Sequence, residues 1–307
     1  MKDITAEIVI RPYQQEDSPL LEELHQSVMK HNPNAVFWWV GDEDNWPNVY
    51  CAYQEGVMIA KGQVGIVNVV PPGRSPASKH SIYVNVKTVP DRAADHELLG
   101  QLYKQLYARA LQLKDTLSTE YGTLLCFGND RSEEANNAFF IQEGYRHLST
   151  LYCMQHNLSE PIPVIELAQG FEYASWAMAT DLEEEEYLEA DSEIWPETPL
   201  GLTRLHEYKR RPNWKALTIR HDGKLAASLM VCQVDDTAEI EEVFVREPWR
   251  KRGLARFLLA QGLTYIQSLG LSKAGLMVLT DNDSALSLYE SIGFLRASEE
   301  IRYCIDL

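Results

Sequence analysis

The stretch VREPWRKRGLARFLL, residues 245–259, concentrates positive charge between a strand-like run and an apolar helix. The run EIEEVFV before it is typical of a strand. After it, apolar residues repeat at helical spacing, namely Leu254, Leu258, Leu259, Leu263 and Ile266. The first N–H groups of a helix have no intrahelical partner and carry the positive end of its dipole. With the neighbouring arginines and lysine, they predict a binding site for an anion such as a pyrophosphate.

A second segment, NDSALSLYESIGF at residues 282–294, follows the first in the chain. Its pattern is Asn282-x-x-Ala285-x-x-Leu288-Tyr289-x-x-x-Gly293-Phe294, and that of the first is Arg250-x-x-Gly253-x-Ala255. Neither the GxGxxG dinucleotide fingerprint nor a Walker GK[ST] loop is present. Together the two segments resemble the signature of the GNAT N-acetyltransferase superfamily. The motifs cover residues 240–294, and the expected strand order extends the resemblance over about 170–307.

The resemblance implies acetyl-CoA as co-substrate. The histidines show no HxxxH or HxH spacing and the cysteines form no CxxC pair, so no metal is expected. Backbone N–H groups of residues 250–255 would hold the pyrophosphate, and the main chain of Val243 and Val245 would pair with the thioester and the pantetheine arm. Asn282 would contact that arm or the helix start, and Tyr289 would lie near the sulfur. The residues expected to bind the co-substrate are Val243, Phe244, Val245, Arg250, Lys251, Arg252, Gly253, Leu254, Ala255, Arg256 and Asn282.

Transfer of an acetyl group to an amine requires a base, because an alkylamine is almost fully protonated at neutral pH. Glu241 and Glu242 lie on the strand before the basic segment, where the family often has this base. Adjacent strand residues are expected to point to opposite faces, so both cannot act in the same way. The position of Glu241 four residues before Val245 favours it, and which of the two is the base stays open. Tyr289 is expected to protonate the leaving thiolate. Solvent-facing carboxylates and a packed tyrosine are the alternatives.

The two halves of the chain repeat one order of strands and helices, which indicates duplication. The fold class is α/β (α+β): two tandem GNAT-like domains, each a mixed, mainly antiparallel twisted sheet flanked by helices. The expected boundaries are 1–158 for the first domain, 159–170 for a linker with two prolines, and 171–307 for the catalytic domain.

The first half departs from the motifs. Asp95 and Glu97 stand at the glycine and alanine positions of the basic segment, where carboxylates would repel a pyrophosphate. Phe140 stands where the second half has Tyr289, and Glu133 replaces Asn282. The sequence therefore predicts a degenerate, non-catalytic first copy with a smaller or empty cleft.

Composition bounds the remaining possibilities. The formal net charge of −17 argues against partners that are themselves polyanions, namely nucleic acid and anionic membranes. No apolar run reaches membrane-spanning length and the start does not resemble a signal peptide, so a cytoplasmic monomer or homodimer is expected.

The function expected from these features is N-acetyl transfer from acetyl-CoA to a primary amine by direct attack. A non-catalytic acyl-CoA-binding or regulatory protein, and an acyltransferase that uses another acyl-CoA, remain open alternatives.

Overall fold

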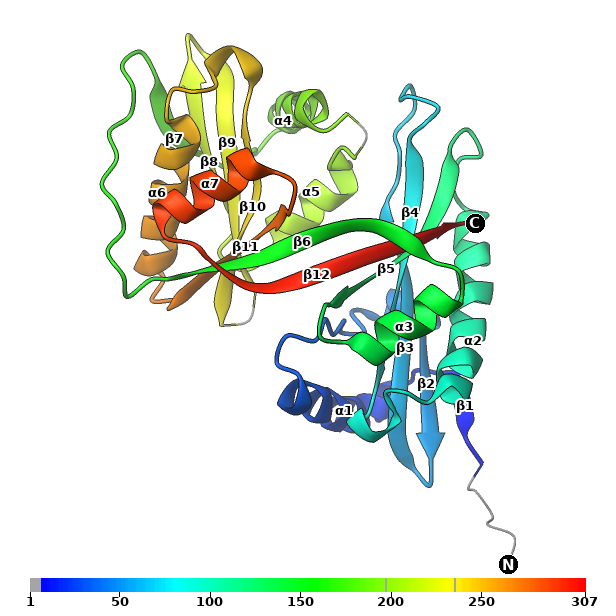
Figure 1. Ribbon diagram of the computed structural model, residues 1–307. Coiled ribbons are helices and arrows are strands. Elements are labelled where there is room, and N and C mark those ends of the chain that lie inside the picture. The colour runs from blue at the N-terminus through cyan, green and yellow to red at the C-terminus, as the bar shows by residue number, and fades with distance from the viewer. Residues whose placement is uncertain (1–6, 197, 235) are drawn as a thin grey trace, which may run out of the picture. The chain divides into compact units, whose positions relative to one another are not determined.

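The computed structural model describes residues 7–196, 198–234 and 236–307, which divide into two compact units. Unit 1 comprises the described residues up to Val70, together with Ser75–Thr150 and Glu300–Leu307. Unit 2 comprises Pro71–Arg74 and Leu151–Glu299. Each unit holds a mixed, mainly antiparallel sheet with helices packed on it, as the sequence predicts (Figure 1).

In unit 1, the strands are antiparallel neighbours in the order β1 (Val9–Pro12), β2 (Val49–Gln54), β3 (Val57–Asn68) and β4 (Lys79–Thr88). Strand β5 (Gly122–Asp130) then pairs parallel with β4. The helices are α1 (Ser18–His31), α2 (His96–Lys114) and α3 (Glu134–Gln142), and the short turns are η1 (Gln15–Asp17), η2 (Glu43–Asn48) and η3 (Pro90–Arg92). Helices α2 and α3 share one buried apolar cluster, whereas α1 packs in another.

Unit 2 repeats this order. The antiparallel strands are β7 (Glu172–Trp176), β8 (Lys215–His221), β9 (Lys224–Val234) and β10 (Thr237–Val245), and β11 (Lys273–Leu279) pairs parallel with β10. The helices are α4 (Asp181–Ile194), α5 (Gly201–Arg210), α6 (Leu254–Ser268) and α7 (Asp283–Ile292), with the turn η4 (Glu247–Trp249). One face of the sheet packs against α6 and α7, and the other packs against α4 and α5 (Figure 1).

Turn chemistry sets the boundaries that the sequence predicts best. Asp222 and Gly223 both have positive φ, +49° and +76°, which suits the two-residue hairpin between β8 and β9. Gly293 closes α7 at φ +103°, a conformation that a side chain disfavours. These signals are local, so they are readable without knowledge of the fold.

The last strand of each sheet comes from the other half of the chain. Unit 1 is completed by Glu300–Asp306 of β12 (Leu295–Asp306), which pair antiparallel with β5. Unit 2 is completed by residues 151–157 of β6 (Arg146–Asn157), which pair antiparallel with β11. The units therefore differ from the expected ranges 1–158 and 171–307. Both strands follow a glycine-closed helix, and nothing local in the sequence specifies the partner of either.

The expected linker at residues 159–170 contains no helix or strand. It belongs to unit 2, where Ile162, Ile165 and Leu167 pack against the cluster beneath α6. The segment is thus fixed by apolar burial rather than by backbone pairing.

Candidate functional site

The parallel strands β10 and β11 separate after a short paired region. Their register joins Ala238 to Ala274 and Glu239 to Gly275. On its other edge β10 continues to pair with β9 as far as Val245, with a register shift between Glu241 and Phe244. The second half of β10 therefore presents one edge that β11 does not cover, and main-chain groups of Val243 and Val245 lie along it.

The register shift is a β-bulge, and it changes which way the side chains point. Before it, Ala238 and Ile240 pack toward α6 and α7; after it, Val243 and Val245 do so. The alternation slips by one residue at Glu242, whose φ is +51°.

Glu241 and Glu242 consequently lie on the same face of the sheet. The Tyr208 hydroxyl of α5 donates to Glu242 Oε1 at 3.5 Å, and Arg211 Nη1 lies 3.6 Å from Glu241 Oε1. The expectation that the two carboxylates point to opposite faces is wrong, because it assumes an unbroken strand.

The carboxyl groups of Glu241 and Glu242 have pKa values above their usual range. Burial raises the pKa of Glu242 from 4.5 to about 7, against the opposing charge of Arg204. Burial also raises the pKa of Glu241, and Arg204 and Arg211 oppose that shift. A carboxyl group with a pKa near neutrality is suited to accept and release a proton at physiological pH.

The N-terminus of α6 begins without a side-chain cap. Gly253 is the N-cap residue at φ +76°, and its carbonyl accepts the amide of Phe257. A Cβ at Gly253 would meet no protein atom within 4 Å, so the space in front of the helix start is open. The N–H groups ahead of Phe257 thus point toward that space without an intrahelical acceptor.

Exposed cations surround this helix start. Arg250, Lys251, Arg252 and Arg256 are all exposed, and Lys251 itself adopts a positive φ of +62°. The Nε of Arg250 donates to the Val245 carbonyl at 3.0 Å, which ties the basic loop to the open strand. Free N–H groups, the helix dipole and four cations can together hold a phosphate or pyrophosphate.

Some residues expected at the site contribute only their main chain. The side chains of Phe244 and Leu254 are buried in apolar clusters on opposite faces of the sheet. Val243 and Val245 pack partly against the cluster on the α6 face, and Ala255 is half-buried. Backbone groups are what the resemblance requires of these positions.

Asn282 and Tyr289 lie on α7. Asn282 is the N-cap residue, and its Oδ1 accepts the Ala285 amide at 3.1 Å, so it organises the helix start. Tyr289 is buried and packs edge-on to Phe294. Burial, and then the charge of Glu242, raise the Tyr289 pKa to about 12, which keeps the hydroxyl protonated at neutral pH.

Several residues near Glu241 and Glu242 are not indicated by the motifs. Glu239 shares their face, and α4 and α5 supply Tyr187, Asp191, Arg204 and Tyr208. Only Glu239 carries a local signal, since it alternates with Glu241 along the strand. The helical residues lie 30 or more positions upstream, in segments that match no motif quoted above.

In unit 1, the corresponding helix start is that of α2, and a side chain of the protein caps it. Asp95 caps α2, its Oδ1 accepting the Leu98 amide at 3.0 Å, and it forms an ion pair of 2.6 Å with Arg92. The Asp95 carboxylate thus lies at the position of α2 that corresponds to the uncapped start of α6.

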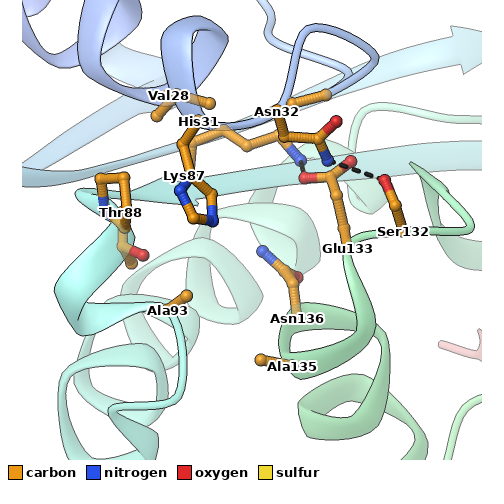
Figure 2. Close-up of a pocket in the computed structure, with 12 residues that line it drawn as sticks. Val28, His31, Asn32, Lys87, Thr88, Ala93, Ser132, Glu133, Ala135 and Asn136 are labelled. Carbon is orange, nitrogen blue, oxygen red and sulfur yellow. Dashed lines mark hydrogen bonds and ion pairs between the residues drawn. The ribbon is translucent and has the colours of Figure 1, made fainter.

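The strands β4 and β5 of unit 1 also separate, beyond the pair Val84–Phe127. There Lys87 Nζ donates to Asn129 Oδ1 at 2.8 Å and to Glu133 Oε1 at 2.5 Å, with both charged side chains at most 9% exposed. A cavity of about 420 Å³ remains among α1, the β4–α2 connection and the start of α3, and Figure 2 shows Lys87 and Glu133 among the side chains that line it. Phe140 stacks on Phe127 and presents no hydroxyl.

Two features are absent from residues 7–196, 198–234 and 236–307. None of their helices combines the length and apolar character needed to cross a membrane. Nor do they contain three or more His, Cys, Asp or Glu side chains arranged to hold a metal ion.

Comparison with known proteins relates part of unit 2 to a known family and part of the chain to named relatives. Residues 176–294 match the acetyltransferase (GNAT) family. A mycothiol acetyltransferase of Thermobispora bispora is 28% identical over 174 residues, covering 52% of this chain and 58% of that protein. A [ribosomal protein bS18]-alanine N-acetyltransferase of Escherichia coli is 31% identical over 85 residues, covering 28% of this chain and 57% of that protein. The matches thus span less than two thirds of these relatives.

Solved structures resemble the whole chain in fold. A GCN5-related N-acetyltransferase from Sphaerobacter thermophilus has a TM-score of 0.75 at 18% identity, covering 97% of this chain and 95% of its own. A tandem GNAT protein from the clavulanic acid biosynthesis pathway has a TM-score of 0.68 at 13% identity, covering 98% of both chains. At these identities the similarity is one of fold.

Proposed function

Because residues 176–294 match the acetyltransferase (GNAT) family and the chain resembles a tandem GNAT protein in fold, we propose that unit 2 transfers the acetyl group of acetyl-CoA to a primary amine. Unit 1 does not take part in the chemistry. Both relatives described above are named acetyltransferases, which supports acetyl as the group transferred.

The contrast between the two helix starts carries the proposal. The N-terminus of α6 has no side-chain cap and is ringed by exposed cations, whereas Asp95 caps α2 and is paired with Arg92. A pyrophosphate would satisfy the amides at Gly253 but would meet a carboxylate at Asp95. In unit 2 the uncovered edge of β10 continues toward this point, so an extended arm could pair with Val243 and Val245.

In the proposed reaction, the amine nitrogen attacks the thioester carbonyl carbon and the carbon–sulfur bond breaks. Glu241 or Glu242 accepts the proton that the amine loses, because both lie on one face and both have raised pKa values. The Tyr289 hydroxyl gives its proton to the departing thiolate, so that the products are an amide and the free thiol of CoA.

Two measurements on the full chain test the proposal. Calorimetric titration with acetyl-CoA is expected to give one site per chain, and a panel of primary amines is expected to release free thiol from acetyl-CoA. Two equivalent sites would contradict the role given to Asp95. Tight binding without turnover of any amine would favour a non-catalytic binding protein instead.

A further inference from the structure

One face of the sheet in unit 2 carries several carboxylates, and the hydrogen bonds there do not satisfy all of their oxygen atoms. We define the carboxylate face as Glu239, Glu241 and Glu242 of β10 with Asp191 of α4. The β-bulge brings the three glutamates to one side, and the charges of Asp191 and Glu241 act on Glu242. All four side chains belong to one unit.

Two buried polar groups at this face have no partner among the described residues. The Tyr187 hydroxyl and Asp191 Oδ1 are fully buried and unpaired, although the other Asp191 oxygen accepts the Leu200 amide at 2.7 Å. The Tyr187 ring lies 5.8 Å from that of Phe244 on β10, and burial, followed by the charges of Glu242 and Asp191, raises the Tyr187 pKa. Buried groups of this kind are costly unless something else satisfies them.

The two arginines near the face act on Glu241 and Glu242 by their charge, and their hydrogen bonds go to groups outside the face. Arg204 donates to the Tyr208 hydroxyl at 3.2 Å, and Arg211 donates to Cys232 Sγ at 3.4 Å. Arg211 approaches Glu241 only to 3.6 Å, which is longer than a hydrogen bond. By contrast, Glu184 on the same helix as Asp191 is paired with both Lys209 and His206.

Of the four carboxylates, Glu239 is the one with the fewest favourable partners for its negative charge. Burial and the charge of Glu241 raise its pKa to about 7, with the charge of Arg211 opposing them, and no donor among the described residues hydrogen-bonds to it. It lies against Gly275 at the last paired position of β10 and β11, where the strands begin to separate. Its carboxylate oxygens are therefore available to a donor entering from that gap.

We propose that the acceptor is a linear diamine and that Glu239 binds its second, non-reacting ammonium group. The proposal rests on the proposed function, because Glu241 and Glu242 face the reacting amine. Residues two apart on a strand are separated by about 7 Å, which is the reach of roughly four methylene groups between two nitrogens. An ammonium supplies three N–H donors, the chemistry that a face rich in acceptors lacks.

The first test compares 1,4-diaminobutane with n-butylamine in the acetyl-CoA assay. The KM for the diamine is expected to be lower by about tenfold or more, the scale of one charged hydrogen bond. In Glu239→Gln the two KM values should converge, because the amide is neutral and nearly the same size. Glu207→Gln, which removes an exposed carboxylate on α5, should keep the preference.

A second variant shifts the carboxylate without removing it. A Cβ on Gly275 would lie 2.6 Å from both Glu239 carboxylate oxygens, so Gly275→Ala must displace this flexible side-chain end. The variant should also weaken the preference for the diamine. It answers the objection that Glu239→Gln only impairs folding.

Binding of the two amines to the full chain, without acetyl-CoA, separates this proposal from the proposed function. Diamine binding near neutral pH should release protons, seen as calorimetric heats that differ between buffers, and Glu239→Gln should reduce that release. Absence of turnover combined with this binding would overturn only the acetyltransferase proposal. Equal KM values, or equal binding when no turnover occurs, would overturn the diamine proposal, as would a preference that survives in both Glu239→Gln and Gly275→Ala.

Discussion

Replacing Glu242 by glutamine should stabilise unit 2 at high pH and leave it nearly unchanged at low pH. Burial raises the pKa of this carboxyl in the folded protein from 4.5 to about 7. The folded state then binds the proton more tightly than the unfolded state, so its contribution to stability is fully present below pH 4.5 and is lost as the pH rises through 7. Glutamine is neutral at every pH and carries no such penalty.

The size of the effect follows from the same pKa. A rise from 4.5 to about 7 corresponds to about 3 kcal/mol of unfolding free energy once the group is ionised in both states. Solvent reaches part of the side chain, which is only half-buried, so about 3 kcal/mol is the upper value. At about pH 4 the wild-type carboxyl is mostly protonated in both the folded and the unfolded state, and the variant and wild type should differ little.

Amide hydrogen exchange in β9 measures the effect of Glu242→Gln on the opening free energy of unit 2 alone, because residues 225–232 of that strand are buried. The gain in opening free energy for Glu242→Gln should appear at about pH 8 and nearly vanish at about pH 4. Glu207→Gln is the matched control and should show no such dependence. A gain of equal size at both pH values, or a loss at the higher one, would refute the reasoning about the buried charge.

Three further changes test the two helix starts and the tyrosine. Gly253→Glu should abolish acetyl-CoA binding, whereas Gly270→Glu, with the same open space and a similar φ at the other end of α6, should bind normally; equal binding by both would remove the anion site. Asp95→Ala should cost unit 1 about 1 kcal/mol by loss of the α2 cap, measured by amide exchange in α2, and Glu97→Ala should cost less. Tyr289→Phe should lower kcat by about a hundredfold or more with little change in the KM for acetyl-CoA, and a wild-type rate would mean that the tyrosine only packs.

The helix starts and ends could be predicted from the sequence because their determinants are local. Gly253, Asn282 and Gly293 mark three of them, and each has the backbone or capping role that its residue type favours. The bulge at Glu242 could not, because a glutamate at φ +51° breaks the rule that makes strand alternation readable. Its conformation depends on the pairing of β10 with β9.

The residues that surround the carboxylates could not be predicted from the sequence either. Tyr208 hydrogen-bonds to Glu242 and Asp191 acts on it by its charge, both from helices far upstream, and nothing in their local pattern distinguishes them from ordinary helix positions. The exchange of the last strands has the same origin, since strand sequence specifies which face is buried better than it specifies the neighbour.

The two units differ most in how they satisfy the polar groups exposed where their parallel strands separate. Unit 1 satisfies them internally: Asp95 caps α2, and the buried pair of Lys87 and Glu133 spans the gap between β4 and β5. Unit 2 leaves the start of α6 uncapped, and Tyr187 and Asp191 keep unpaired buried atoms. Buried polar groups without hydrogen bonds lower the stability of the fold. Their presence is therefore explained best if a ligand hydrogen-bonds to them. By that reasoning we propose that substrate binds at unit 2, where these hydrogen bonds are incomplete, and not at the cavity of unit 1, where Lys87 and Glu133 already pair with each other.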